Sequence, residues 1–183
     1  IKKGHNINIS GLASREFASA PTQKFVSVSP QDFNYIKPKL LVKEGDHVSL
    51  GDALFFDKIN PDVKWPSIAA GTISKIIYGE RRTVLDIIIE IDENDEKNSD
   101  PISERNLSSR ADVKNFIQNN NLWPFITQRP FNKVVDPNDS PKCIIVSLAD
   151  SSPLANDLSF SLADKKNHIV SALSNLKKLT DGD

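Results

Sequence analysis

Residues 42–58 read VKEGDHVSLGDALFFDK, and this stretch is the strongest indication of the fold. Two Gly-Asp pairs divide it into short apolar runs, and turn signals between such runs predict short strands. Residues 63–92, VKWPSIAAGTISKIIYGERRTVLDIIIEID, continue the pattern with more isoleucine. Six of the seven glycines lie between Gly4 and Gly79, so we expect a β-rich first half and a differently built second half.

Residues 42–76 resemble a lipoyl or biotinyl carrier domain in three features: the hairpin EGD-x-V-x-x-GD-x-L, the following DK, and VKWPSIAAG-x-I. The resemblance implies a barrel-sandwich hybrid domain over residues 1–92. The modified lysine of a carrier stands at the tip of the turn between the two halves, and Lys58 is the nearest equivalent. Because the segment from Lys58 to Pro66 is longer than in a lipoyl domain, we expect Lys58 on the shoulder of a strand. A carrier module modified at Lys58 is the alternative hypothesis for the function.

Residues 93–110, ENDEKNSDPISERNLSSR, are polar and charged, and Pro101 interrupts them. Such a composition is typical of a linker or a solvated loop, so we place the domain boundary there. The fold class is then α+β and multidomain, with residues 111–183 as the start of a Rossmann-like α/β domain. One strand and two helices cannot close a doubly wound core, so we expect this domain to be incomplete.

Three elements are expected in the second half. Ser108 or Ser109 can cap a helix through ADVKNFIQNN, which is residues 111–120. The apolar run KCIIVSLAD, residues 142–150, predicts a buried strand, and Cys143 within it predicts a buried, unreactive thiol. A final helix within residues 163–183 carries an apolar stripe and has lysines in its last turn. The stripe is formed by Ile169, Ala172, Leu173, Leu176 and Leu179.

The overall composition excludes several classes of function. The 23 Lys and Arg residues and the 24 Asp and Glu residues nearly cancel and are dispersed, which disfavours a nucleic-acid partner. No apolar run approaches the ~20 residues that span a bilayer, so membrane contact would come through another chain. The chain contains no methionine, so we expect that it is trimmed at its N-terminus.

The sequence offers no recognisable catalytic or metal-binding set. His5, His47 and His168 lie in separate segments without ligand spacing, and the single cysteine has no partner in a C-x-x-C motif. Ser151 and Ser152 beside an aspartate are better explained by a turn or a cap than by a nucleophile. A phosphate cradle needs glycine for close approach of the backbone, and no glycine occurs between Gly79 and Gly182. We therefore expect no catalytic residue, no metal and no cofactor bound by these 183 residues.

Three stretches together resemble the A subunit of the Na⁺-translocating NADH:quinone reductase. They are IKKGHNINISGLA from Ile1, FFDKINPDVKWPSIAAGTISKIIYGERRTVLDIII from Phe55, and LWPFITQRPFNKVVDPNDSPKCIIVSLADSSPLAND from Leu122. The resemblance implies the N-terminal part of a longer subunit that has later β-grasp and C-terminal regions. It also implies a peripheral place on the cytoplasmic face of the bacterial inner membrane, among the other subunits of a sodium-transporting oxidoreductase. That complex uses ubiquinone and contains NAD, FAD, FMN, riboflavin and iron-sulfur elements elsewhere.

The third stretch contains the candidate site, LWPFITQRPFNK at residues 122–133. Related flavin-binding subunits have a glycine-rich loop near this position, so the resemblance implies that FMN binding was lost here. Two prolines restrict the backbone around the aromatic residues. The stretch can fill a core, dock another subunit or contact ubiquinone. The candidate contact residues are Trp123, Phe125, Arg129 and Phe131.

Overall fold

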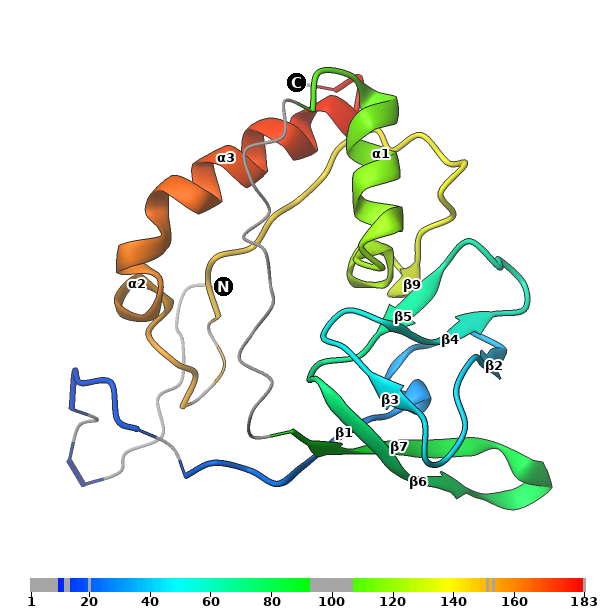
Figure 1. Cartoon of the computed structure of the whole chain (residues 1–183). Coiled ribbons are helices and arrows are strands. Elements are labelled where there is room, and N and C mark those ends of the chain that lie inside the picture. Colours follow the sequence, from blue (N-terminus) through cyan, green and yellow to red (C-terminus); the bar gives the residue numbers. More distant parts are fainter. Residues whose placement is uncertain are drawn as a thin grey trace. The chain divides into compact units, whose positions relative to one another are not determined.

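The structure is a computed structural model that describes residues 10–11, 14–19, 21–92, 107–150, 152 and 154–182 (Figure 1). Residue contacts divide the chain into two compact units. We call Thr22–Ser140 the β unit, and Ile1–Pro21 together with Pro141–Asp183 the helical unit. The expected linker falls mostly outside the described residues, so the domain boundary within residues 93–110 stays a prediction.

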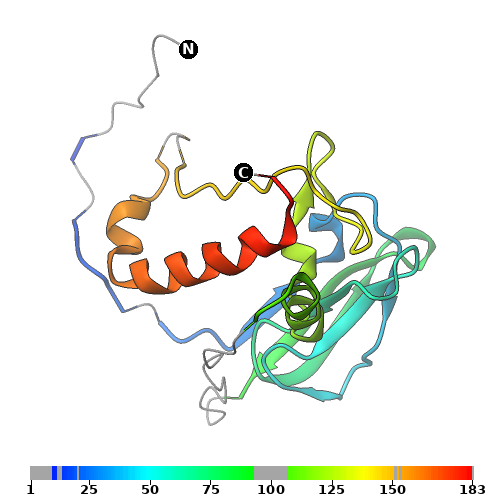
Figure 2. The ribbon, with the colours of Figure 1, turned by 90° about the horizontal axis from the view of Figure 1, so that it is seen from above.

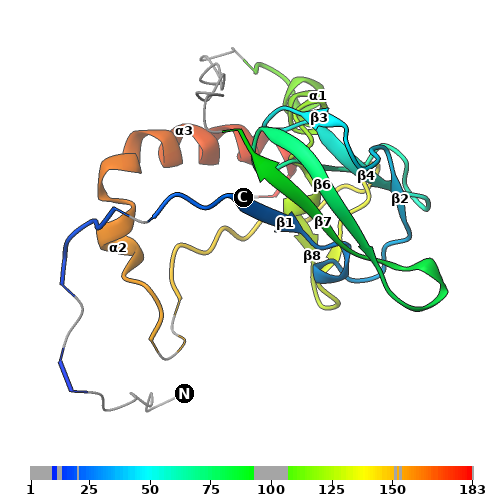
Figure 3. The ribbon, with the colours of Figure 1, turned by 60° about the horizontal axis from the view of Figure 1, so that its bottom comes forward.

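Seven strands of the β unit form two antiparallel sheets. The first sheet has the order β1 (Phe25–Val28), β7 (Val84–Ile91), β6 (Gly71–Tyr78) and β3 (His47–Val48), and β6 and β7 form its long hairpin (Figure 3). The second sheet has the order β2 (Pro38–Leu40), β4 (Ala53–Asp57) and β5 (Lys64–Pro66). Single-turn 3₁₀ helices occupy Pro30–Asp32 and Glu80–Arg82. The turn-rich pattern of the first half therefore produced the expected short strands.

The core of the β unit is built from alternating apolar positions of these strands. The Phe55 ring stacks on that of Trp65 with ring centroids 4.9 Å apart, and Phe33 meets Trp65 edge-on. Gly71 permits the close approach of β6 to β7, because a Cβ there would overlap the carbonyl oxygen of Glu90. The strand residues of the core are Val28, Val48, Leu54, Phe55, Trp65, Ile73, Ile76, Val84, Ile87 and Ile89.

Residues 107–140 complete the β unit with one helix and a small hairpin. Ser109 is the N-cap of helix α1 (Arg110–Asn119) and forms a capping box with Asp112, as expected for one of the two serines. Val113 and Ile117 are buried and form the inner face of α1. A 3₁₀ turn at Trp123–Phe125 follows, and strands β8 (Thr127–Gln128) and β9 (Lys133–Val134) pair as an antiparallel hairpin.

The helical unit contains α2 (Leu158–Ser161) and α3 (Lys166–Leu176), with 3₁₀ turns at Ala163–Lys165 and Lys177–Leu179 (Figure 2). The final helix was thus correctly expected, and lysines occupy the turn that ends it. Only part of its apolar stripe is covered, since Leu179 is buried whereas Leu173 is 39% exposed.

The expectation of a buried strand at residues 142–150 was wrong. This segment is extended but has no strand partner among the described residues, and the Ile145 side chain is 84% exposed. Cys143 is also exposed, so the expectation of a buried thiol was wrong as well. A strand needs a neighbouring strand for its backbone hydrogen bonds. The described part of the helical unit provides helices and turns but no second strand, so apolar character alone could not bury the segment.

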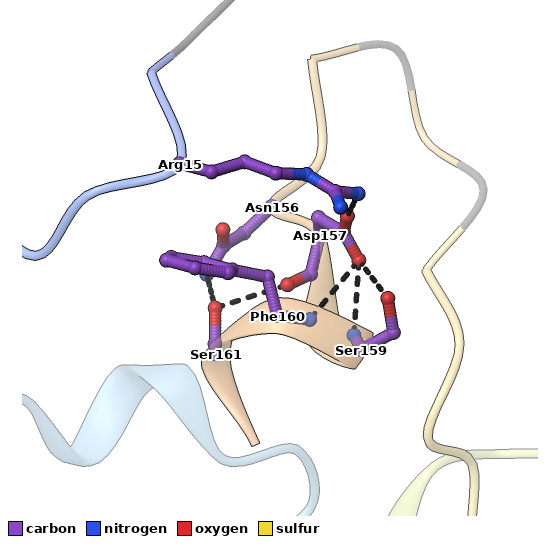
Figure 4. Close-up of polar contacts among 6 residues, drawn as sticks. All are labelled: Arg15, Asn156, Asp157, Ser159, Phe160 and Ser161. Atoms are coloured by element: carbon purple, nitrogen blue, oxygen red, sulfur yellow. Dashed lines mark hydrogen bonds and ion pairs between the residues drawn. The ribbon is translucent and has the colours of Figure 1, made fainter. Parts of the chain in front are cut away.

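Two residues of the N-terminal segment, Arg15 and Phe17, contact the start of α2 (Figure 4). Arg15 forms an ion pair with Asp157, with 2.6 Å between Nη2 and Oδ2, and the Phe17 ring stacks on that of Phe160 at 4.9 Å. Asp157 also caps α2 by accepting from the backbone N–H groups of Ser159 and Phe160. One carboxylate therefore joins the start of α2 to a segment 142 positions earlier in the chain.

Candidate docking site

Asn121 anchors the aromatic stretch to the β sheets. Its backbone has a left-handed φ of 56°, a conformation that asparagine tolerates better than most residues. Its Nδ2 donates a hydrogen bond of 2.9 Å to the carbonyl oxygen of Gly51, which lies in the turn before β4. The end of α1 is thereby fixed to the turn that precedes β4 of the second sheet.

Trp123 and Pro124 fill the core of the β unit. Trp123 is 5% exposed, and its Nε1 donates to the carbonyl oxygen of Val135 at 2.8 Å. Pro124 is among the most buried side chains. The core-filling interpretation therefore applies to this part of the stretch, and the buried indole cannot form an exposed contact surface.

The other three candidate residues are exposed around the β8–β9 hairpin. Phe125 ends the 3₁₀ turn and is 60% exposed, and Phe131 lies in the hairpin loop and is 65% exposed. Arg129 is also exposed, and the peptide bond between it and Pro130 is cis. The structure thus separates the predicted set into a buried tryptophan and three surface residues.

A fourth residue, which is aromatic, joins this surface from the first half of the chain. A parallel bridge pairs Asn34 with Lys133 of β9, and the adjacent Tyr35 is 69% exposed with a φ of 63°. We call Tyr35, Phe125, Arg129 and Phe131 the hairpin surface. Sequence reasoning missed Tyr35 because no local pattern links residue 34 with residue 133. The anchor Asn121 was missed too, although three consecutive asparagines before LWPF are a signal for an unusual backbone conformation.

Lys58 follows β4 directly and is exposed. Its backbone N–H donates to the carbonyl oxygen of Lys37 at 2.9 Å, so its backbone remains paired with the chain leading into β2. The turn beyond it is closed by hydrogen bonds from Asn60 N–H to the Asp57 carbonyl and from Val63 N–H to the Asn60 carbonyl. Lys58 thus lies on the shoulder of the strand, as expected, and not at the tip of the turn.

The remaining candidates do not form a reactive set within the part of the chain that the structure describes. Nε2 of His47 lies 3.0 Å from Oδ2 of Asp92, and both side chains are 55% exposed. His168 is exposed on α3. Ser152 donates to Asp150 from its hydroxyl and its backbone N–H, and these bonds lower the pKa of that carboxyl, which agrees with the turn interpretation. His5 and Ser151 lie outside the described residues.

The described residues offer neither a metal cluster nor a membrane-spanning helix. No group of three or more His, Cys, Asp or Glu side chains there could hold a metal ion. None of the helices described combines the length and the apolar character needed to cross a bilayer.

The start of α1 does not fit a flavin phosphate. The Asp112 carboxylate accepts hydrogen bonds from the Ser109 backbone N–H at 2.8 Å and from the Ser108 hydroxyl at 3.0 Å. Hydrogen bonds from Ser109 and Ser108 hold the pKa of Asp112 below its ordinary value, so a negative charge already occupies the position that favours an anion. The residues around the hairpin surface offer no glycine that would let the backbone wrap a phosphate.

Comparisons with known proteins identify both domains. Residues 1–92 match the model of the NqrA N-terminal barrel-sandwich hybrid domain, and residues 108–183 match that of the NqrA second alpha/beta domain. The chain is 35% identical to the A subunit of the Na(+)-translocating NADH-quinone reductase of Photorhabdus laumondii, over 184 aligned residues. It is 33% identical to the protein of the same name from Yersinia pseudotuberculosis and 35% identical to that from a Marinomonas strain. Each alignment covers 100% of this chain and 41% of the relative.

The two domain matches define a class of protein, in which a barrel-sandwich hybrid domain is followed by an α/β domain, and this confirms the expected fold class. The chain belongs to the NqrA family, the A subunits of the Na⁺-translocating NADH-quinone reductase, as its three sequence stretches indicated. It spans less than half of the length of the curated relatives it matches.

Proposed function

We propose that this chain is part of a peripheral subunit of a Na⁺-translocating NADH:ubiquinone oxidoreductase, where it docks other subunits and contributes to ubiquinone binding. Its family membership supports a place in such a complex. The proposed location is the cytoplasmic face of the bacterial inner membrane, with membrane contact through partner subunits. NAD, FAD, FMN, riboflavin and iron-sulfur elements belong to other parts of the complex in this proposal.

The observation that carries the proposal is the hairpin surface. Tyr35, Phe125 and Phe131 are each more than half exposed, and the arginine of the hairpin surface is exposed as well, although the chain is only 7% aromatic. Aromatic residues and arginine are the residues that dominate binding energy at interfaces. A quinone ring is flat and apolar with carbonyl acceptors, so it can stack on a phenyl ring while Arg129 donates to an oxygen.

The support beneath this surface favours binding over mobility. The Asn121 side chain and the Trp123 indole each hold it through a hydrogen bond to a backbone carbonyl. A surface held in one conformation loses less entropy when a partner binds. The buried anchors therefore act as positioning residues, and the exposed residues make the contact.

Photo-crosslinking with a ubiquinone analogue on the assembled complex tests the quinone contact. We expect labelled peptides within residues 122–133 or 33–37, and less labelling when Phe131 is changed to alanine. Phe25→Ala serves as the matched control, because Phe25 is also exposed (51%) but lies on β1. Labelling confined to other peptides and unchanged in Phe131→Ala would contradict the quinone contact.

Subunit docking has a separate readout. A tagged chain carrying Phe125→Ala and Arg129→Gln should co-purify with less of the other subunits than the wild type or Phe25→Ala. Unchanged co-purification combined with reduced quinone labelling would leave only the quinone contact. Unchanged results in both measurements would contradict the role of the hairpin surface.

The carrier hypothesis rests on exposed Lys58 in a barrel-sandwich hybrid. We expect an unmodified intact mass after native expression, because the lysine is not at the tip of its turn. A lipoyl or biotinyl mass increment mapped to Lys58 would support the carrier hypothesis instead.

A further inference from the structure

Two adjacent arginines lie at the end of the long β6–β7 hairpin. The paired part of the hairpin ends with Tyr78 opposite Val84, and the 3₁₀ turn Glu80–Arg82 connects the two strands. Figures 1 and 3 show this end projecting away from the other strands of the β unit. Arg81 and Arg82 are exposed, and Tyr78, which precedes the turn, is 49% exposed. We call Tyr78, Arg81 and Arg82 the arginine tip.

The backbone of the arginine tip has a conformation in which arginine is uncommon. Arg81 and Arg82 have left-handed φ angles of 54° and 59°. The Thr83 N–H donates to the carbonyl oxygen of Glu80 at 3.1 Å, which closes the turn. Hairpin turns with two left-handed central residues strongly favour asparagine and glycine, because most other residues are strained there. The turn by itself therefore does not explain two arginines, and strained residues of this kind point to a function.

Contacts within the hairpin hold the backbone of the turn in place. The Gly79 N–H donates to the carbonyl oxygen of Thr83 at 2.8 Å. The Leu85 side chain lies against Gly79, since a Cβ added to that glycine would be 3.0 Å from Leu85 Cδ2. A partner that binds such a turn does not have to order its backbone, which reduces the entropy lost on binding.

The described part of the chain does not neutralise the charge of the arginine tip. None of its ion pairs or side-chain hydrogen bonds involves Arg81 or Arg82. The first carboxylate along β7, that of Asp86, already accepts a hydrogen bond from the Ser29 hydroxyl. Glu80 is exposed and supplies one negative charge against the two positive charges. A net positive charge therefore remains at an exposed end of the fold.

An acidic protein segment fits the arginine tip better than a lipid surface does. A guanidinium forms two parallel hydrogen bonds to one carboxylate, and arginine and tyrosine dominate the binding energy of protein interfaces. Binding to anionic lipid uses clusters of basic residues or apolar side chains that enter the membrane. The turn offers only two basic residues, Gly79 and Thr83 provide no apolar anchor, and anionic headgroups would repel Glu80.

We propose that the arginine tip docks a segment rich in aspartate and glutamate on another subunit of the complex. Carboxylates of that segment pair with Arg81 and Arg82, and the Tyr78 ring packs against it. This inference rests on the proposed place of the chain in the complex, but it involves no residue of the hairpin surface.

Charge reversal tests the proposal on the intact subunit, tagged and purified with its complex from the native host. Arg81→Glu combined with Arg82→Glu should lower the recovery of the other subunits by about tenfold, because repulsion replaces attraction. Arg81→Lys combined with Arg82→Lys should keep most of the recovery, because the charge remains. Lys75→Glu is the matched control, since Lys75 is exposed on β6 of the same hairpin but lies outside the turn. Circular dichroism and urea unfolding verify that each variant is folded.

A photo-crosslinking amino acid in place of Thr83 identifies what lies opposite the arginine tip. We expect a crosslink to a peptide of another subunit that contains several aspartates or glutamates. Changing those carboxylates to lysines should then restore the recovery of the variant with Arg81→Glu and Arg82→Glu. A purely structural role of the two arginines would not produce this rescue.

Several outcomes would overturn the proposal. Equal recovery in the charge-reversed variant and in Lys75→Glu would show that the charge of the tip does not contribute to docking. A crosslink to lipid or to a peptide without carboxylates, or no crosslink at all, would also exclude an acidic partner segment. Absence of the other subunits from the wild-type preparation would instead contradict the proposed function, and this inference would fall with it.

Discussion

Trp65 and Trp123 are both buried in the β unit, but their indole nitrogens are in different situations. Trp123 Nε1 is bonded to the Val135 carbonyl, whereas Trp65 Nε1 has no hydrogen-bond partner among the described residues. A buried polar group without a partner costs about 1–3 kcal/mol, and the phenyl ring of phenylalanine lacks this donor. The two tryptophans thus allow a test of what each N–H contributes.

We expect Trp65→Phe to lower the free energy of unfolding less than Trp123→Phe does, by a difference of about 1–2 kcal/mol. Both changes remove similar ring area, but only the second leaves a carbonyl oxygen without its donor. Urea unfolding followed by circular dichroism measures the difference. A larger loss for Trp65→Phe would contradict the expectation that the Trp65 N–H destabilises the folded protein.

Asp112 makes the start of α1 sensitive to acid. Hydrogen bonds from Ser109 and Ser108 lower its pKa in the folded protein, so its contribution to stability is complete above the ordinary carboxyl pKa. The contribution is lost as the pH falls through the lowered folded-state pKa. The stabilisation comes from the charged form, which Asp112→Asn cannot adopt.

The destabilisation caused by Asp112→Asn should therefore shrink as the pH is lowered from about 6 to about 3. Thermal unfolding of both proteins across this range measures it. Asp62→Asn is the control, because Asp62 lies exposed in the turn after β4. A difference from wild type that stays constant with pH would argue against the capping box.

At the scale of elements, α2 is only four residues long and depends on its cap. Asp157 accepts from the Ser159 and Phe160 N–H groups, and hydrogen bonds from these residues, with the Ser159 hydroxyl first, lower its pKa. The ion pair with Arg15 is exposed, with side-chain exposures of 74% and 44%, so solvent screens it.

Asp157→Ala should consequently speed hydrogen exchange in α2 more than Arg15→Ala does. Loss of an N-cap typically costs about 1 kcal/mol, whereas exposed ion pairs contribute about 0–1 kcal/mol. Exchange rates at Ser159 and Phe160 provide the measurement. Equal effects of the two changes would mean that the ion pair, and not the cap, holds α2.

At the scale of the whole molecule, the two units differ in how much apolar core they contain. Of the fifteen buried hydrophobic residues among those described, Leu179 alone belongs to the helical unit. Apolar burial is the dominant favourable contribution to folding. The β unit should therefore be the more stable of the two.

We expect unfolding of the chain in two steps, with the helical unit first. Both tryptophans lie in the β unit, so fluorescence follows that unit alone, while far-ultraviolet circular dichroism also follows α2 and α3. The dichroism signal should begin to fall at lower urea than the fluorescence signal. Coincident curves would indicate a single cooperative transition.

Local patterns predicted the elements whose causes are local. The Gly-Asp turns, the serine cap of α1 and the apolar stripe of α3 each depend on neighbouring residues, and the structure contains all three elements. The prediction of a buried strand at residues 142–150 was wrong because a buried strand needs a neighbouring strand, and the local sequence does not show whether one is present. The sequence predicted only part of the candidate site for the same reason, because two of its contacts are not local. The Trp123 indole donates to the carbonyl oxygen of Val135, and a bridge between Asn34 and Lys133 places Tyr35 beside β9.

The ion pair between Arg15 and Asp157 has a consequence for folding during synthesis. The ribosome adds Arg15 to the growing chain 142 residues before it adds Asp157. At about 5–20 residues per second, the N-terminal segment waits on the order of ten seconds for its counterpart. Because all of Thr22–Ser140 is synthesised during that interval, the β unit can fold before Arg15 and Asp157 pair.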